Sequence, residues 1–288
     1  MKKEANLSIV SANYNNADYL KEYLKSIFSS TLLPKEIIIV DDGSTDNSIE
    51  VLNEVKSNLL KIVVLEENQG FSNALNIGVK LSDSKYIIRI DTDDYIASTR
   101  IEEQYNYMIA HPEIDLLGSN CYYFNSQTGK IIFKTNVQLN HKDIEKRIKN
   151  GLHGIIHGSL ICKSEILKKY LYRQSSFPAE EYDIFARILR DGYIFQNLSA
   201  PLTYIRIHKK SVSNDMPFST VKKTFQINSE IFYKKNNILK IYNQYLHIHF
   251  YRKALYQKSK YKMIIYLIIS SLFNMSRLLN RIITRRNI

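Results

Sequence analysis

The sequence predicts an α/β fold in which a parallel sheet is covered by helices on both faces. Four apolar runs within residues 7–90 are rich in β-branched side chains and lack alternation with polar residues. Each run is followed by a segment with apolar residues at helical spacing, as successive βα units require. The chain has 288 residues, of which 44% are hydrophobic, so it is long enough to bury the core of such a sheet.

The first two βα units lie in "LSIVSANYNNADYL" and "EIIIVDDGSTDNS". The first segment is a short apolar strand that breaks into polar residues, and a helical pattern follows from Asp18 to Ile27. The second segment is an apolar strand that leads into a turn containing Gly43. Asp46 stands where a helix cap is expected, before a second helix that carries apolar residues as far as Val55.

The same plan continues along the chain. "KIVVLEENQG" is the third strand, "GFSNALNIGVKLS" the third helix and "KYIIRI" the fourth strand. A fourth helix is predicted to end near His111, because Pro112 follows it. We expect further strands in "GSNCYYFN" and "KIIFKTNV", and helices beyond Asp215.

Polar clusters follow each of the four parallel strands. They comprise residues 13–15, 41–46, 68–70 and 91–94. In open α/β sheets, ligands bind at the carboxyl ends of the strands. The four clusters are therefore expected to meet at one rim of the sheet and to form the functional site there.

Asp91, Thr92 and Asp93 form a D-x-D pattern at the end of the fourth strand. In extended backbone, residues two apart point the same way, so both carboxylates can face one hard cation such as Mn²⁺ or Mg²⁺. The alternative is that Asp93 or Asp94 only satisfies backbone amides of a turn, and we expect this supporting role for Asp94.

Several of these segments together resemble the family-2 inverting glycosyltransferases, which have the GT-A fold. The resemblance spans about residues 7–213 and rests on the segments already quoted and on "YIIRIDTDDY", "HGSLICKSEIL", "FPAEEYDIFARI" and "YIRIH". It implies a mixed central sheet, with a nucleotide-sugar half at residues 1–115 and an acceptor half at 116–213. Residues 214–288 would form a helical, basic extension.

The resemblance also implies roles for single residues on the donor side. Asp42 would bind the base of a UDP-sugar, and Tyr14 would pack near that base. Asp91 and Asp93 would hold the diphosphate through the metal, which His208 would approach. Asn68 and Gly70 lie on the same rim and complete the donor side.

An inverting transfer needs a base that takes the proton of the acceptor hydroxyl. The family places an Asp for this role in a Glu-Asp pair. This chain has "AEEYD", so Glu181 stands at that position after Glu180, and Asp183 is a second candidate. We expect His157 to line the acceptor side.

The charge of the chain is concentrated at its C-terminal end. Residues 209–288 hold sixteen of the 40 Lys and Arg residues but two of the 28 acids. The apolar and basic residues after Lys260 predict an amphipathic helix that lies on an anionic membrane surface rather than spanning it. The absence of a leader pattern and the presence of two unpaired cysteines favour a cytoplasmic protein.

These features together predict an inverting, metal-dependent hexosyltransferase at the cytoplasmic face of the inner membrane. It would move galactose or glucose from a UDP-sugar to a lipid-linked saccharide such as GlcNAc-diphosphoundecaprenol, in a β linkage, for example β-1,3, during O-antigen or capsule synthesis. A sugar-phosphate nucleotidyltransferase is the first alternative, but "SANYNNADY" lacks the expected glycine-rich phosphate loop. A basic nucleic-acid-binding protein is the second, but the aspartates of the rim would repel a phosphate backbone.

Overall fold

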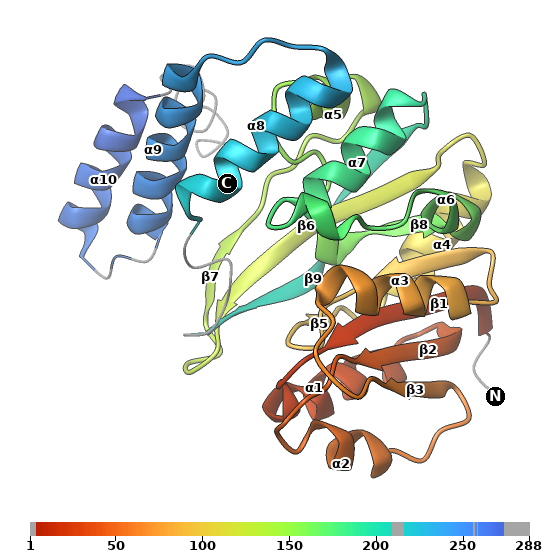
Figure 1. Ribbon diagram of the computed structural model, residues 1–288. Coiled ribbons are helices and arrows are strands. Elements are labelled where there is room, and N and C mark those ends of the chain that lie inside the picture. Colours follow the sequence, from red (N-terminus) through yellow and green to blue (C-terminus); the bar gives the residue numbers. More distant parts are fainter. Residues whose placement is uncertain (1–3, 209–215, 256, 258, 274–288) are drawn as a thin grey trace. The chain divides into compact units, whose positions relative to one another are not determined.

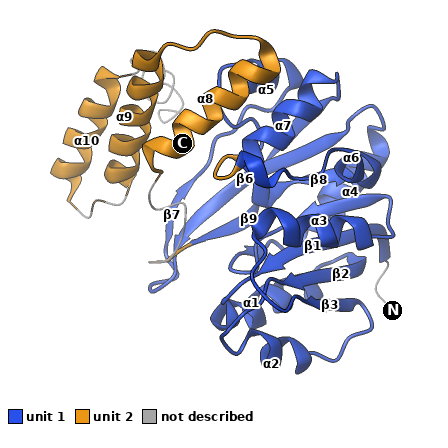
Figure 2. Cartoon of the chain, viewed as in Figure 1, with its two compact units in different colours: residues 1–176, 180–206 blue, residues 177–179, 207–288 orange. Residues whose placement is uncertain are grey.

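The computed structural model describes residues 4–208, 216–255, 257 and 259–273 (Figure 1). It divides into two compact units (Figure 2). The first unit comprises residues 1–176 and 180–206, and the second comprises residues 177–179 and 207–288. The boundary predicted after Ser213 falls outside the described residues.

A nine-stranded mixed sheet forms the centre of the first unit, as the resemblance implied. Its strands are β1 (Glu4–Asn13), β2 (Leu33–Asp41), β3 (Leu60–Val64), β4 (Tyr86–Arg89), β5 (Tyr95–Ile96), β6 (Leu116–Asn125), β7 (Ile131–Lys134), β8 (Ile161–Lys163) and β9 (Phe195–Ile207). The order is β3-β2-β1-β4-β8-β6-β9-β5, and β7 pairs with β6. The first four strands pair in parallel, and β8 joins β4 antiparallel. All four predicted parallel strands are therefore present.

Seven helices of the first unit surround this sheet: α1 (Ala17–Phe28), α2 (Ser48–Asn53), α3 (Phe71–Leu81), α4 (Arg100–Ala110), α5 (His141–Ile148), α6 (Ser164–Tyr170) and α7 (Glu180–Arg190). Two cores explain why the strands lack polar alternation. Ile37 and Ile39 of β2 pack into one core with residues of α1 and α4, whereas Ile38 and Val40 pack with Ala74 of α3 into the other. Successive strand residues point to opposite faces, and here both faces are buried.

The second unit contains three helices among the described residues: α8 (Phe218–Phe232), α9 (Ile238–Leu255) and α10 (Lys260–Leu272). Val221, Phe225 and Ile241 form its small core. The Ser270 hydroxyl lies 2.9 Å from Nδ1 of His247 and joins α10 to α9. Within the described part of the chain, every helix is too short or too polar to cross a membrane.

Candidate active site

The "DDGSTD" turn after β2 is built around Asp41. Its carboxylate accepts hydrogen bonds from the Ser44 backbone N–H at 2.8 Å, the Ser44 hydroxyl at 2.7 Å and the Asn13 amide at 2.7 Å. Asp41 is fully buried. Its role is to join the ends of β1 and β2, so it belongs to the frame of the rim rather than to its ligand-facing surface.

Asp42, the next residue, holds the loop that precedes α3. One carboxylate oxygen accepts from the backbone N–H of Gln69 at 2.8 Å, and the other accepts from that of Gly70 at 2.9 Å. Gly43 has φ +71°, and a Cβ there would lie 2.6 Å from the carbonyl carbon of Glu67, so the close approach of the two loops requires glycine. Asn68 also accepts from the Gly70 N–H, at 3.2 Å.

These contacts bring Asp42, Asn68 and Gly70 together on one side of the rim, as the sequence predicted. Tyr14 follows β1 and is 45% exposed. Each carboxylate oxygen of Asp42 uses one lone pair to accept a hydrogen bond from the loop, and a carboxylate has about four lone pairs that can accept. Asp42 is only 3% exposed, so its contact with the base of a donor stays a prediction.

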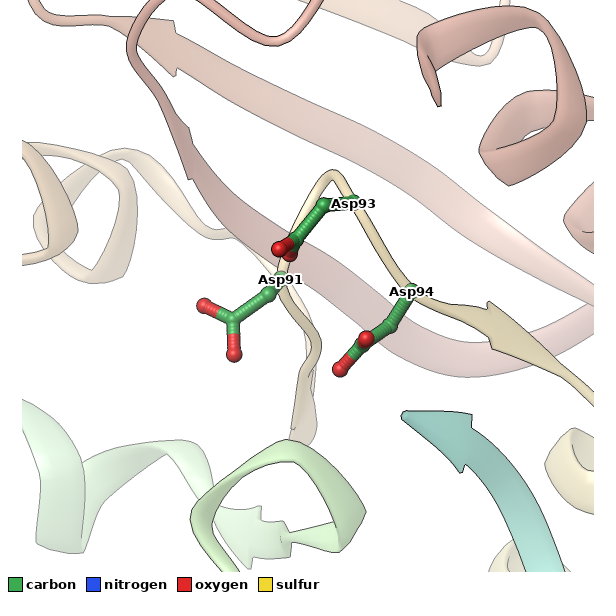
Figure 3. A group of neighbouring side chains, drawn as sticks. All are labelled: Asp91, Asp93 and Asp94. Carbon is green, nitrogen blue, oxygen red and sulfur yellow. The ribbon is translucent and has the colours of Figure 1, made fainter. Parts of the chain in front are cut away.

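Three aspartates lie on one turn between β4 and β5 (Figure 3). One carboxylate oxygen from each of Asp91, Asp93 and Asp94 lies within 4.8 Å of the others. The Asp94 N–H also donates to the Asp91 carbonyl at 3.2 Å. Asp94 thus both supports the turn, as expected, and joins the carboxylate cluster.

Arg89 at the end of β4 binds both oxygens of Asp91, with one Nη–Oδ distance of 2.7 Å. The Arg89 side chain is 3% exposed, whereas that of Asp91 is 36% exposed. Partial burial and the nearby carboxylates of Asp93 and Glu181 raise the pKa of Asp91 to about 6, against the opposing effect of Arg89.

The cluster has the donor set that a hard divalent cation prefers, namely several carboxylate oxygens within a few ångströms. Arg89 occupies part of the acceptor capacity of Asp91, and the Arg206 backbone N–H occupies one acceptor site of Asp94. The residues therefore fit Mn²⁺ or Mg²⁺. His208, the third predicted ligand, belongs to the second unit, so its approach to the aspartates stays a prediction.

Two buried arginines contact this turn or the segments beside it. Arg206 of β9 donates its backbone N–H to Asp94 and its Nε–H to the carbonyl of Asp93, both at 2.7 Å, and pairs with Glu22 of α1. Arg100 of α4 donates to the Gly158 carbonyl at 2.8 Å. No local sequence pattern indicates either set of contacts, because both join segments that are far apart in the chain.

Gly158 comes close to the aspartate turn. A Cβ on it would lie 3.6 Å from an Asp94 oxygen and 3.9 Å from an Asp91 oxygen. His157, Gly158 and Ser159 form a short 3-10 helix. His157 is 3% exposed and thus lies beneath the site.

Glu181 and Asp183 both lie in the first turn of α7, but their surroundings differ. The Glu181 side chain is 38% exposed and one oxygen lies 3.0 Å from Nδ1 of His157. Asp183 is completely buried between Arg173 and Arg187, with a 2.8 Å bond to the Nε of Arg187. Asp183 therefore stabilises the fold, and Glu181 is the more accessible of these two carboxylates.

The electrostatics of Glu181 follow from its neighbours. Burial alone would raise its pKa, but the hydrogen bond with His157 and the charge of Arg89 hold the pKa of Glu181 well below its usual range. Burial raises the pKa of the adjacent Glu180, whose Oε2 has no hydrogen-bond partner among the described residues. His157 contacts Glu181, and the next residue, Gly158, lies close to Asp91 and Asp94, so the predicted base and the aspartate turn lie near each other.

Comparison with known proteins agrees with this geometry. The model of the family described as Glycosyl transferase family 2 matches residues 8–171. The Escherichia coli protein named UDP-Glc:alpha-D-GlcNAc-diphosphoundecaprenol beta-1,3-glucosyltransferase WfaP is 29% identical over 212 residues, which span 72% of this chain and 79% of that protein.

Two solved structures share the fold. S. aureus TarS in complex with UDP-GlcNAc superposes with a TM-score of 0.65 at 18% identity, covering 94% of this chain and 82% of that one. Mannosyltransferase PcManGT from Pyrobaculum calidifontis, in complex with GDP-Man and Mn²⁺, superposes with a TM-score of 0.57 at 15% identity, covering 99% of this chain and 80% of that one.

Proposed function

Because this chain belongs to glycosyltransferase family 2 and has the GT-A fold, we propose that it transfers a hexose from a UDP-sugar, with inversion, to a hydroxyl of a lipid-linked saccharide. One observation carries the proposal. An ionised carboxylate, Glu181, shares a site with the Asp91–Asp93–Asp94 turn at the carboxyl ends of the parallel strands. Glycosyl transfer needs both a base and a place for a diphosphate.

The donor would bind along the rim. Asp42 and Tyr14 lie on the side where the base and ribose are expected, and Asp91 and Asp93 face the diphosphate. A bound Mn²⁺ or Mg²⁺ would neutralise the negative charge that develops on the leaving diphosphate. Arg89, buried beneath Asp91, fixes that carboxylate in a single orientation.

In the reaction, Glu181 would accept the proton of the acceptor hydroxyl as its oxygen attacks the anomeric carbon. The new carbon–oxygen bond forms on the face opposite the breaking bond, UDP departs with the bonding electron pair, and the linkage becomes β. Asp183 cannot take this role while both of its oxygens are bound by arginines. A carboxylate that is ionised and partly exposed, as Glu181 is, satisfies the first requirement of a base.

The lipid-linked acceptor is supported by the surface of α10. Tyr261, Ile264, Ile268 and Leu272 recur at three- and four-residue intervals, and each is at least half exposed. Lys260 and Lys262 flank the start of this stripe. Such a face fits the interface of an anionic bilayer, where a polyprenyl diphosphate sugar would be embedded.

The finer details of the proposal follow the relative WfaP and the sequence resemblance. They are a glucose or galactose donor, a GlcNAc-diphosphoundecaprenol acceptor and a β-1,3 linkage, in O-antigen or capsule synthesis at the cytoplasmic face of the inner membrane. The predicted basic continuation of the α10 stripe, with Arg277, Arg281, Arg285 and Arg286, lies outside the described residues. Family membership favours glycosyl transfer over nucleotidyl transfer and over nucleic-acid binding.

A transfer assay tests the proposal. The protein is incubated with Mn²⁺, a panel of UDP-hexoses and a synthetic GlcNAc-diphosphate lipid, and the anomeric configuration of the product is determined by NMR. We expect a β-linked product, and kcat at least about 100-fold lower in Asp93→Asn and in Glu181→Gln. An α-linked product, or full activity of Glu181→Gln, would contradict the mechanism.

The variant Asp183→Asn distinguishes the role of Asp183 from that of Glu181. Since it removes one partner of a buried ion pair, it is expected to lower the free energy of unfolding by about 3–5 kcal/mol while the folded fraction keeps its kcat. Asp191→Asn, a change at an exposed ion pair just beyond the same helix, is the matched control. A folded Asp183→Asn protein without turnover would reassign the base.

A further inference from the structure

We infer that His157 and Tyr172 are positioning residues that hold one oxygen of Glu181 and leave the other for the acceptor hydroxyl. The inference rests on the proposed function, because it takes Glu181 as the base. It goes beyond that function by assigning two buried side chains whose contacts with each other no sequence pattern indicates.

The three side chains form a continuous chain of hydrogen bonds. The Tyr172 hydroxyl lies 2.6 Å from Nε2 of His157, and Nδ1 of His157 lies 3.0 Å from Oε1 of Glu181. The imidazole is 3% exposed and is enclosed by the rings of Phe71 and Phe185, whose centroids are 6.2 and 5.9 Å away. Enclosure on these sides leaves the ring little freedom to rotate.

Tyr172 is itself fixed by α3. The side-chain amide of Asn76 donates to the Tyr172 carbonyl at 2.8 Å, and its oxygen accepts from the Tyr172 N–H at 2.7 Å. A side chain that satisfies both backbone groups of one residue acts as a clamp. The hydrogen-bonded chain therefore extends from α3, through the residues after α6 and the 157–159 turn, to Glu181 on α7.

The protonation states of His157 and Tyr172 determine which atom donates in each of these hydrogen bonds. Burial, assisted by the charge of Arg89, lowers the pKa of His157 to about 4, so the imidazole is neutral near pH 7. Burial raises the pKa of Tyr172 above its usual value, so its hydroxyl keeps its proton. A neutral imidazole has one donor and one acceptor. Only one tautomer serves both neighbours: Nδ1–H donates to Glu181, and Nε2 accepts from Tyr172.

This arrangement orients the base. The Nδ1–H of His157 binds Oε1, while Oε2 of Glu181 has no hydrogen bond among the described residues and belongs to a side chain that is 38% exposed. Oε2 is thus the oxygen that can receive the proton. The other ionisable groups that act on the Glu181 carboxylate are Arg89, His153, Glu180 and Asp91, and none of them is altered in the test below.

Two amide substitutions at position 157 give a matched pair. The Asn side chain can place its nitrogen near the position of Nδ1 and so keep the bond to Glu181, whereas the Gln side chain reaches toward the position of Nε2 and loses that bond. We expect His157→Gln to lower kcat by about 10- to 100-fold, the range for lost supporting hydrogen bonds, with KM for the UDP-sugar changed less than about twofold. His157→Asn is expected to recover most of the loss.

The pH profile provides a readout that a purely structural role would not move. A hydrogen bond to the ionised form lowers the pKa of a carboxylate, so the acidic limb of kcat against pH should move to higher pH in His157→Gln and stay near its original position in His157→Asn. Tyr172→Phe should lower kcat several-fold. Tyr170→Phe, which removes a hydroxyl bound to Asp191, is the control and should keep its kcat. An equal decrease of kcat in the Asn and Gln variants, or an increase of KM with kcat unchanged, would overturn the inference.

A substrate-free measurement separates this inference from the proposed function. The imidazole ¹⁵N chemical shifts of His157 should report the Nδ1–H tautomer in the wild-type protein, and Tyr172→Phe should perturb the Nε2 signal. An Nε2–H tautomer would overturn the inference even in an active enzyme. An Nδ1–H tautomer in a protein that transfers no sugar would contradict the proposed function instead.

Discussion

His157 shows how burial of a single residue makes stability depend on pH. Its pKa is lowered from 6.5 to about 4 by burial and then by Arg89, so between these values the unfolded chain binds a proton that the folded protein excludes. Its contribution to stability is present above pH 6.5 and is lost as the pH falls toward 4. The loss amounts to about 3 kcal/mol for a shift of this size.

Urea denaturation at several pH values can measure this effect. Between pH 6.5 and 4, His157→Asn should lack the part of the pH dependence of the free energy of unfolding that is due to His157, because Asn does not titrate. Asp91, whose pKa is raised to about 6, contributes with the opposite sign in this window, and its contribution is common to the variant and the wild-type protein. His111→Asn, at an exposed histidine, is the matched control and should keep the wild-type slope. Identical slopes in all three proteins would show that His157 has the same pKa in the folded and unfolded states.

At the scale of elements, α3 is pressed against the sheet at Gly78. A Cβ at that position would lie 2.6 Å from a methyl carbon of Val10 on β1. Ala is ordinarily preferred to Gly in a helix by about 1 kcal/mol, but here overpacking should dominate. We expect Gly78→Ala to destabilise the protein by about 1–3 kcal/mol in urea denaturation. The control is Lys80→Ala, on the exposed face of α3. It should change the free energy of unfolding by less than about 0.5 kcal/mol.

The exposed apolar stripe of α10 leads to a second prediction at this scale, which concerns membrane binding. Replacing Ile264 and Ile268 together by Asn should weaken binding to anionic vesicles by at least about tenfold, because each buried Ile contributes about 1.5–3 kcal/mol when removed from water. The control is Ile109→Asn, an equally exposed isoleucine of α4 in the first unit. Cosedimentation with vesicles containing phosphatidylglycerol measures the binding of the double variant and of the control. Unchanged binding of the double variant would refute a membrane role for the stripe.

For the whole molecule, ligand binding should appear as thermal stabilisation. A ligand at 100 times its Kd adds about 2.7 kcal/mol to the free energy of unfolding. We expect UDP with Mn²⁺ to raise Tm by more than UDP with EDTA, and Asp93→Asn to abolish the difference. An equal shift in EDTA would show that UDP binding does not require a cation.

The whole fold also shows which features of the molecule could be predicted from its sequence. Apolar runs such as Ile37–Val40 are local signals, so the parallel strands and the rim at their carboxyl ends were foreseen. The contacts of Arg89, Arg100 and Arg206 were not, because each depends on segments that only the completed fold brings together; Arg206, for example, reaches a turn 112 positions earlier in the chain. The preference for Glu181 over Asp183 likewise required the burial and ion pairs of α7.

The Asn76 clamp on Tyr172 also bears on how this site can change over evolutionary time. Phe at position 172 would leave Nε2 of His157 without a donor, and Ala at position 76 would release the backbone that presents the tyrosine. Neither change is neutral while the other members stay in place. Positions 76, 157, 172 and 181 should therefore be inherited together, and descendants of this lineage should alter them as a set rather than one by one.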